Sequence, residues 1–437
     1  KPLFYLKSDK QFIFSSDLNA IKTIKNVKVK EEALIKYLGF SYIPEPETIY
    51  NNVYKLGCGE QIIIENSNFK HSDYWTPLVN PTFVGSIQEA TSKLEAILFE
   101  ASKLQIRSDV PIGVFLSGGI DSSAIAAFIA RQNNHDTINT FTVNFQGKEG
   151  QDTKFAKIIA DSINAKHEVI NLNSSNLALA LDELLPVMDE PLSDSAIVPT
   201  YILSKYAREK GIKVLLSGAG GDEVFGGYKR HFPMKFGGAA WIAQHKLIRN
   251  LFKIITKYTH PHLSRRLASP ARNFAISISG ANLELLNKSL SNTQHYHNLL
   301  SNFENIFYDA SSPKIIDRMR LDLQTYLPNN IMSLTDKATM AASVEGRVPL
   351  LDHRLVEFAF SLPSDFNPLW GKDKGLFKSL LVNYLPKEIL NRKKEGFSAP
   401  MNNWVESDPS TIREELLGNT SPILKNLLNF KIIENWL

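Results

Sequence analysis

The chain has 437 residues, 43% of them hydrophobic, so it can bury at least one large core and is expected to form two or three domains. Its 49 Lys and Arg residues barely exceed its 45 Asp and Glu residues, so the net charge is too small to indicate nucleic-acid binding as its main function. The lone cysteine, Cys58, excludes an intrachain disulfide and a thiolate zinc site and favours a reducing cytoplasm. The absence of a long apolar run and of a secretory signal pattern predicts a soluble protein.

Residues 1–80 form the first predicted unit, which is rich in strands. The segments KPLFYL, QFIFSS and EQIIIEN predict strands, and EEALIKYLGF predicts a helix. A stretch with prolines, 76–85, predicts a linker, and a long amphipathic helix follows it and ends near Ile106. Because the chain begins within a predicted strand and ends on the uncapped helical pattern ENWL, we expect both ends to be cuts within a longer protein.

From about residue 108 to 228, strand patterns alternate with helix patterns. The segments VPIGVFL, TINTFTVNF, KHEVINL and KVLLSG predict strands, and helices are predicted around residues 122–132, 152–163 and 197–210. This alternation predicts βαβ units with a parallel sheet, whose ligands bind at the carboxyl ends of the strands. Beyond about residue 229 the strand signal fades, so residues 229–437 are expected to be mainly helical.

The most specific motif is VFLSGGIDSSAIA, residues 114–126, in which a strand runs through Ser117, Gly118 and Gly119 into a helix. Glycines let the backbone approach a phosphate closely, and the free N–H groups at the start of a helix attract anions. No GxxxxGK[ST] pattern occurs at this turn, so the loop differs from that of kinases and motor ATPases. The motif therefore predicts a cradle for the pyrophosphate part of a nucleotide.

Four further blocks accompany this loop: MDEPLSDSAIVPTYILSKYA, LSGAGGDEVFGGY, DKATMAASVEGRVPLLDHRLVEFA and RKKEGFSAP. Together they resemble the glutamine-hydrolysing asparagine synthetase family, and residues 1–75 are similar to the end of its glutaminase domain. The resemblance implies an α/β fold, with a remnant of a glutaminase-type β layer over residues 1–80. Residues 85–437 are then a parallel-sheet adenylating domain of the PP-loop, adenine nucleotide alpha hydrolase-like type, with an α/β core over about 108–228 and a helical part over about 229–437.

The resemblance also implies a ligase that uses ATP and Mg²⁺. In the family's reaction a carboxylate attacks the α-phosphate of ATP, pyrophosphate leaves, and ammonia converts the acyl-adenylate into an amide. The expected partners are therefore ATP, a carboxylate acceptor and ammonia, which is derived from glutamine in the full-length enzyme. The acceptor is aspartate or, from the charge pattern, a sugar uronate, and the sequence leaves a homodimer open.

The expected site residues lie within these blocks. Asp121 and Asp222, at the carboxyl ends of predicted strands, are by resemblance the magnesium ligands, and Lys372, Lys374 and Lys394 match the lysines near the phosphates, with Lys394 the expected catalytic lysine. Nucleotide contacts are expected from Leu116, Ser117, Gly118, Gly119, Asp121, Ser122, Ser123, Val143, Ser217 and Gly218. Without the motif context, Asp222 is equally consistent with an ordinary turn residue, and each of the three lysines is consistent with a solvent-exposed side chain. Glu345, Arg347 and Asp352 are expected to form a structural ion-pair cluster behind the site or to take part in it.

The sequence departs from the family's pattern at two places. The family's glutaminase starts with a cysteine nucleophile, whereas this chain starts with Lys1, and Cys58 is expected to be a partly buried packing residue. We therefore expect that this chain does not hydrolyse glutamine. The second departure is Ala219, at a position where the asparagine-forming members usually carry an acidic residue close to the meeting point of aspartate and ammonia.

A basic stretch follows the second loop. No acidic residue lies between Glu223 and Glu284, while Lys and Arg residues accumulate over residues 229–272. This stretch is either a charged outer helix or a surface for an acidic acceptor or a membrane, and with Ala219 it favours a uronate over free aspartate. Two rival functions stay open: an adenylating ligase that closes a lactam or peptide-type amide without ammonia, and a catalytically inactive binding module with the same fold.

Overall fold

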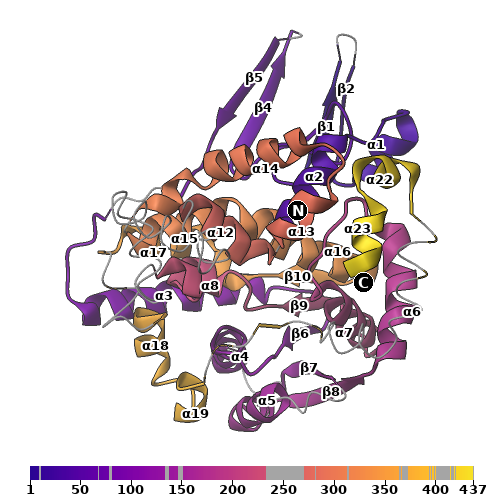
Figure 1. Ribbon diagram of the computed structural model, residues 1–437. Helices are drawn as coiled ribbons and strands as arrows, with labels where there is room; N and C mark the ends of the chain where they lie inside the picture. Colours follow the sequence, from indigo (N-terminus) through magenta and orange to yellow (C-terminus); the bar gives the residue numbers. More distant parts are fainter. Residues whose placement is uncertain are drawn as a thin grey trace, which may run out of the picture.

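The structure, a computed structural model, describes most of the chain (Figure 1). The described residues are 1–232 without 9–10, 67, 78–80, 133–136 and 146–150; 270–363 without 281 and 313; 373–392; 420–436; and the single positions 366, 394, 396, 397, 399, 414 and 418. A parallel sheet lies at the centre, with helices around it and the N-terminal strands at one end of the molecule.

Five strands form the central sheet, in the order β10-β9-β6-β7-β8, and every neighbouring pair is parallel. The expected strands are present as β6 (Ile112–Phe115), β7 (Asn139–Phe145), β8 (Lys166–Leu172) and β9 (Val214–Leu216). The fifth strand, β10 (Glu345–Arg347), carries no strand signal because its three residues, EGR, contain no apolar run. The expected parallel sheet is thus confirmed, with one additional strand at its edge.

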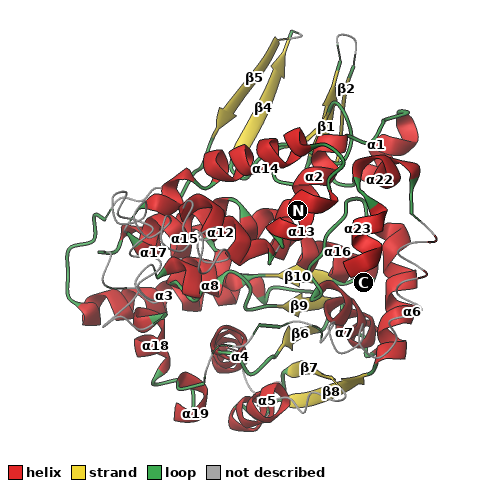
Figure 2. Ribbon diagram, in the orientation of Figure 1, coloured by secondary structure: helices red, strands yellow, loops and turns green. Residues whose placement is uncertain are grey.

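Alternating side chains along the strands bury both faces of this sheet. In β9, Val214 and Leu216 belong to one hydrophobic core and Leu215 belongs to another. Helices α3 (Ile87–Gln105), α4 (Ile120–Gln132) and α5 (Gln151–Ser162) pack on the first core, and α6 (Ser174–Leu184), α7 (Ile197–Glu209) and α16 (Ser333–Ala341) pack on the second. Figure 2 shows helices on either side of the strands, the arrangement of a doubly covered parallel sheet.

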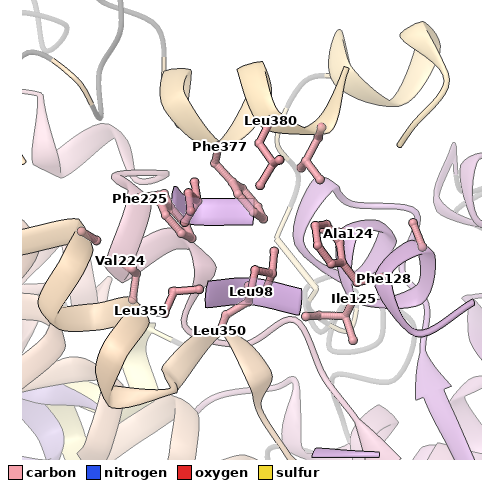
Figure 3. Close-up of a cluster of buried hydrophobic side chains, with 14 of the residues drawn as sticks. Leu98, Ala124, Ile125, Phe128, Val224, Phe225, Leu350, Leu355, Phe377 and Leu380 are labelled. Carbon is pink, nitrogen blue, oxygen red and sulfur yellow. The ribbon is translucent and has the colours of Figure 1, made fainter. Parts of the chain in front are cut away.

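The first core extends beyond the sheet to α18 (Gly375–Leu381), which begins directly after Lys374. Figure 3 shows Phe377 and Leu380 of this helix pointing into the cluster that also contains Phe225 and Phe128. The rings of Phe225 and Phe377 stack with their centroids 4.4 Å apart. Burial of a side chain of this size contributes about 1.5–3 kcal/mol, so the core holds the start of α18 in place.

The N-terminal residues form two small antiparallel sheets. The first has the order β2-β1-β3, and the second pairs β4 with β5. The bounds are β1 (Phe4–Lys7), β2 (Phe12–Ser15), β3 (Val53–Lys55), β4 (Glu60–Glu65) and β5 (Asn68–Asp73), with helices α1 (Leu18–Ile24) and α2 (Glu31–Phe40). The expected β1, β2, β4 and α2 are present, whereas β3, β5 and α1 are too short or too polar to give a pattern. Figure 1 shows both hairpins extending away from the body.

Helices dominate the described residues after 229, as expected. They include α12 (Pro270–Ser279), α13 (Leu283–Ser289), α14 (Thr293–Ile306), α15 (Ile315–Gln324), α17 (His353–Ser361), α19 (Lys387–Leu390), α22 (Pro422–Leu427) and α23 (Phe430–Trp436). Phe40 of the N-terminal layer packs edge-on against Phe303 of α14, with ring centroids 4.7 Å apart. The N-terminal layer and the helical part therefore share a hydrophobic core.

Most of the basic stretch 229–272 lies outside the described residues, which end at residue 232 and resume at 270. Within its described part, Arg230 is 8% exposed and pairs with Asp322, and Arg272 pairs with Glu304 at 2.8 Å. These two arginines therefore have acidic partners from the helical part. Among the described residues, no helix combines the length and the apolar character needed to cross a bilayer.

Candidate active site

A cavity of about 420 Å³ opens at the carboxyl ends of β6, β7 and β9, where the sheet was expected to bind its ligand. Of the predicted site residues, those that line it are Leu116, Ser117, Gly119, Asp121, Ser122, Val143, Ser217, Gly218, Asp222, Lys374 and Lys394. Gly118 and Ser123 do not line it, and both are buried, while Lys372 lies outside the described residues. The cavity thus brings together residues from five separate segments of the sequence.

The first loop, between β6 and α4, owes its shape to one glycine and two serines. Gly118 has a φ of +66°, and a Cβ at this position would lie 2.5 Å from the backbone nitrogen of Ala156. The Ser117 N–H donates to Ser122 Oγ at 3.2 Å, and Ser122 Oγ donates to the Gly119 carbonyl at 3.1 Å. Ser122 therefore ties the loop into a tight turn in front of the helix.

The second loop, after β9, lies directly against the first. A Cβ on Gly218 would be 2.5 Å from the backbone nitrogen of Ser122, so only glycine allows this approach. The loop leads into the short helix α8 (Gly221–Phe225), which carries Asp222 in its first turn. Close packing of the two loops is what places Asp222 beside Asp121.

Two carboxylates and two ammonium groups alternate on the floor of the cavity. The Lys374 Nζ lies 2.6 Å from Asp121 Oδ1 and 2.7 Å from Asp222 Oδ1. The Lys394 Nζ lies 2.6 Å from Asp222 Oδ2. The Lys374 side chain is 3% exposed, whereas that of Lys394 is 34% exposed. Lys374 therefore sits within the array, and Lys394 reaches it from the open side.

The pKa values of the array follow from burial and from these pairs. Burial raises the pKa of Asp121, and this effect exceeds the lowering by Lys374. Burial acts in the same direction on Asp222, but Lys374 and Lys394 outweigh it and hold the pKa of that carboxyl well below its usual range. For Lys374 burial acts to lower the pKa, and the two carboxylates more than reverse it. Burial lowers the pKa of Lys394. Lys374 is thus the more firmly protonated lysine.

Several residues that the sequence did not single out also line the cavity: Asp152, Asp194, Glu223, Tyr228, Tyr326 and Arg392. Arg392 donates from Nη1 to the Ser117 carbonyl at 2.9 Å and pairs with Asp152 through Nη2. It thereby braces the first loop against α5. The quoted sequence blocks contain Arg392, Asp194, Glu223 and Tyr228, so a signal for these four was present, but nothing local indicates that residues 152 and 326 reach the same cavity.

Acidic side chains remain in the cavity although Ala219, which also lines it, carries none. Glu223 is 2% exposed, and burial beside Asp222 raises its pKa to about 7. Asp194 accepts a hydrogen bond from Asn330 Nδ2 at 2.8 Å. The cavity wall therefore offers carboxylates at other positions than the one that Ala219 occupies.

Two expectations about residues outside the cavity need correction. Arg347 pairs with Glu345 at 2.8 Å, but Asp352 pairs with Arg354 instead, so the expected three-residue cluster is not formed. None of Glu345, Arg347 and Asp352 lines the cavity. Cys58 is exposed and not partly buried, because its turn packs through the neighbouring Gly59, where a Cβ would lie 1.9 Å from the Trp75 carbonyl oxygen.

The donor set on the cavity floor fits a magnesium ion that takes its other ligands from phosphate and water. Asp121 and Asp222 converge on one point, which the Lys374 ammonium occupies. No cluster of three or more His, Cys, Asp and Glu side chains suited to a metal occurs in the part of the chain that the structure describes. Mg²⁺ commonly binds through one or two carboxylates together with substrate phosphates, so two carboxylates suffice.

The doubly covered parallel sheet, with a glycine loop between its first strand and the following helix, defines an α/β adenylating domain of the PP-loop type. Sequence comparison assigns the family. A family model described as asparagine synthase matches residues 93–437, and one described as a glutamine amidotransferase domain matches residues 1–75. The chain belongs to the asparagine synthase family.

Curated relatives agree with this family. The chain is 29% identical over 418 residues to asparagine synthetase [glutamine-hydrolyzing] 1 of Bacillus subtilis, a match that covers 93% of this chain and 65% of the relative. It is 34% identical over 238 residues to putative asparagine synthetase [glutamine-hydrolyzing] 2 of Methanocaldococcus jannaschii, covering 53% of this chain and 45% of the relative. The chain therefore spans less than two thirds of the length of these relatives.

Solved structures also match, at low similarity. An NH3-dependent NAD synthetase from Campylobacter jejuni is 15% identical over 51% of this chain and 95% of that chain, with a TM-score of 0.23. A TM-score this low adds nothing to the fold assignment, which rests on the sheet order, the loop and the family match.

Proposed function

We propose that this chain adenylates a carboxylate with ATP and converts the acyl-adenylate into an amide with ammonia. The observation that carries the proposal is the Asp121–Lys374–Asp222–Lys394 array beside the Ser117–Gly119 loop. Such an array offers carboxylates for a metal and cations for phosphate oxygens within one enclosed site. The match of residues 1–75 to a glutamine amidotransferase domain supports glutamine as the source of ammonia in the whole protein.

The chemistry proceeds in two steps. An oxygen of the acceptor carboxylate forms a bond to the α-phosphorus of ATP while the bond from that phosphorus to the bridging oxygen breaks, and pyrophosphate leaves. Ammonia then adds to the acyl carbon and loses a proton, and AMP leaves as the amide carbonyl forms again. Asp121 and Asp222 would hold Mg²⁺, which when bound supplies positive charge to the phosphates.

The protein's own groups stabilise the charge that develops on pyrophosphate. Lys394 lies on the open side of the array, so its ammonium is placed to meet a phosphate oxygen. Lys374 maintains the spacing of the two carboxylates, and Arg392 holds the loop on which the phosphates rest. Leu116 and Val143 provide apolar walls for adenine, and Ser217 and Gly218 line the nucleotide from the next strand.

The acceptor is proposed to be a carboxylic acid, with aspartate and a sugar uronate as the two candidates. Ala219 and the basic residues of 229–272 favour the uronate, whereas Asp194 and Glu223 supply partners for an ammonium group. The pyrophosphate-exchange reaction separates them, because it reports the acid that is adenylated. A lactam-forming ligase would release its product without added ammonium, and an inactive binding module would show no exchange.

The test is ATP–pyrophosphate exchange with a panel of acids that includes aspartate and uronates. We expect exchange with one class of acid and its loss in Asp121→Ala. Asp109→Ala, which removes an exposed carboxylate outside the cavity, serves as the matched control and should retain exchange. Exchange that persists unchanged in Asp121→Ala would contradict the assignment.

Ammonium salts should support amide formation, and glutamine should not support it in this chain, whose one cysteine is Cys58.

A further inference from the structure

An aromatic ring lies against Lys394 on the cavity wall. The Lys394 Nζ lies 3.6 Å from the centroid of the Tyr228 ring, which is within the range of a cation–π interaction. The same ammonium lies 2.6 Å from Asp222. Tyr228 comes from the segment after α8, and Lys394 comes from the segment after α19. The tertiary structure alone brings these two residues together.

The Tyr228 ring is itself held from several directions. Its hydroxyl donates to Glu223 Oε1 at 2.9 Å. The guanidinium carbon of Arg230 lies 3.8 Å from the centroid of the same ring. Arg230 donates through Nε to Asp322 at 2.7 Å, and Asp322 is fully buried. A buried ion pair therefore fixes the arginine, and the arginine and the glutamate fix the ring.

Lys394 needs such support because its side chain is 34% exposed. A lysine has four rotatable bonds, and an ion pair that solvent can reach stabilises a single rotamer only weakly. An aromatic face that is rigidly held adds a second contact and restricts the direction in which the ammonium points. The contact thus counters the mobility that Lys394 would otherwise have.

We propose that Tyr228 is a positioning residue that holds the Lys394 ammonium toward the phosphate side of the cavity. The catalytic consequence rests on the proposed function, in which Lys394 stabilises charge on the departing pyrophosphate. The ring contributes through its aromatic face, and the hydroxyl contributes by anchoring the ring to Glu223. The Arg230–Asp322 pair supports the ring from behind the cavity wall.

Two substitutions separate the ring from its hydroxyl. Tyr228→Phe keeps the aromatic face and removes the hydrogen bond to Glu223. Tyr228→Leu keeps apolar bulk and removes the face. Tyr384→Leu is the matched control, since Tyr384 also carries a cation over its ring, Arg131 at 3.8 Å, but does not line the cavity. If Tyr228→Leu does not fold, pentafluorophenylalanine at position 228 keeps the shape of the ring and reverses the charge distribution of its face.

The first measurement is independent of activity. Lysine side chains of the full chain are ¹³C-dimethylated, and the Lys394 signal is assigned by its loss in Lys394→Arg. A nearby ring face shifts this signal upfield, so we expect the shift in the wild type, in Tyr228→Phe and in Tyr384→Leu. We expect it to be lost in Tyr228→Leu. A Lys394 signal at the position of a free lysine in the wild type would overturn the proposal.

The second measurement is the kinetics of pyrophosphate exchange. Tyr228→Leu should lower kcat about 5–30-fold, the range that a partly desolvated cation–π contact represents, with a small change in the KM for ATP. Tyr228→Phe should stay within about threefold of the wild type. If Tyr228→Phe and Tyr228→Leu lower kcat equally, the effect comes from the hydrogen bond to Glu223, and the proposed role of the aromatic face is overturned. Absence of exchange in the wild type would contradict the proposed function, while the Lys394 signal would still test the positioning.

Discussion

At the scale of single residues, the two lysines of the array differ in burial, although the sequence motifs predict both to lie near the phosphates. Lys374 is 3% exposed and touches two carboxylates, whereas Lys394 is 34% exposed and touches one of them and an aromatic ring. A buried cation between two acids contributes mainly to the structure of the site. An accessible cation at its edge is free to act on a ligand. The two lysines therefore call for different experiments.

Lys394→Ala should lower kcat far more than it raises the KM for ATP. If Lys394 meets phosphate charge in the transition state, the barrier should rise by about 2–4 kcal/mol, as for other groups that stabilise developing charge. Steady-state exchange kinetics measure the two parameters separately. Lys387→Ala, an exposed lysine on the nearby helix α19, is the control and should behave as the wild type. A change confined to KM would show that Lys394 only binds ATP.

Lys374→Met should destabilise the protein, because it leaves the partly buried Asp121 and Asp222 beside each other without the buried cation that they share. Removing one partner of a buried pair typically costs about 3–5 kcal/mol. Urea denaturation measures the loss, and the double variant with Asp121→Asn should recover part of it. Added Mg²⁺ should stabilise Lys374→Met more than the wild type if the carboxylates accept the ion. Equal stabilisation of both proteins would argue against a metal site at these carboxylates.

At the scale of elements, the first loop, between β6 and α4, is a turn that requires glycine for two separate reasons. Gly118 has a positive φ and also faces the backbone of α5, where a Cβ would be 2.5 Å from the Ala156 nitrogen. Gly211 has a φ of +85° as well, but a Cβ there would meet nothing within 4 Å. Comparing substitutions at Gly118 and Gly211 therefore separates the cost of backbone strain from the cost of steric overlap.

Gly118→Ala should therefore lower the free energy of unfolding more than Gly211→Ala does. Strain alone at a positive φ costs about 1 kcal/mol, and the forced shift of α5 adds to it at Gly118. Thermal or urea unfolding measures both variants, and the KM for ATP should rise only in Gly118→Ala. Equal losses of stability in the two variants would mean that the first loop accommodates the added methyl group without a shift of α5.

At the scale of the whole molecule, the segment 188–194 links the N-terminal layer to the cavity. Glu190 pairs with Lys55 at 2.7 Å and accepts from the Ile49 N–H at 2.9 Å, and Asp194 of the same segment lines the cavity. Asp189 pairs with Lys337 of α16 at 2.5 Å. The division into residues 1–80 and 85–437 stays a prediction, but these contacts indicate that the two parts stabilise each other.

Lys55→Met should destabilise the protein at neutral pH by about 3 kcal/mol, because Glu190 then keeps its charge in a buried place without a cation. Burial already raises the pKa of Glu190, and loss of Lys55 raises it further. A carboxyl whose pKa is higher in the folded than in the unfolded state favours folding when protonated. The loss should therefore shrink as the pH falls from 7 toward 5.

Urea denaturation of Lys55→Met at several pH values tests this expectation. The double variant with Glu190→Gln removes the charge and is the control, so it should show little of the pH dependence. A loss of stability that is the same at pH 5 and pH 7 would mean that Glu190 reaches solvent when Lys55 is absent.

The amino-acid sequence by itself determined the sheet strands with apolar runs, the loop and the identity of the family. Each of these depends on neighbouring residues: β6 and β9 are short apolar runs, β7 alternates apolar and polar residues, β8 carries Val169, Ile170 and Leu172, and SGGIDSS is a local turn into a helix. The motif context also selected Asp121, Asp222, Lys374 and Lys394, all of which line the cavity. Local patterns sufficed where the cause of the structure is local.

The tertiary structure decided what depends on residues far apart in the chain. β10 forms because the edge of β9 offers hydrogen bonds to three residues that have no strand pattern of their own. Lys374 lies between two acids because α18 is packed on Phe225, and Tyr228 meets Lys394 only once both segments line one cavity. Burial, which sets the pKa of each group in the array, arises from the whole fold and has no counterpart in a local sequence pattern.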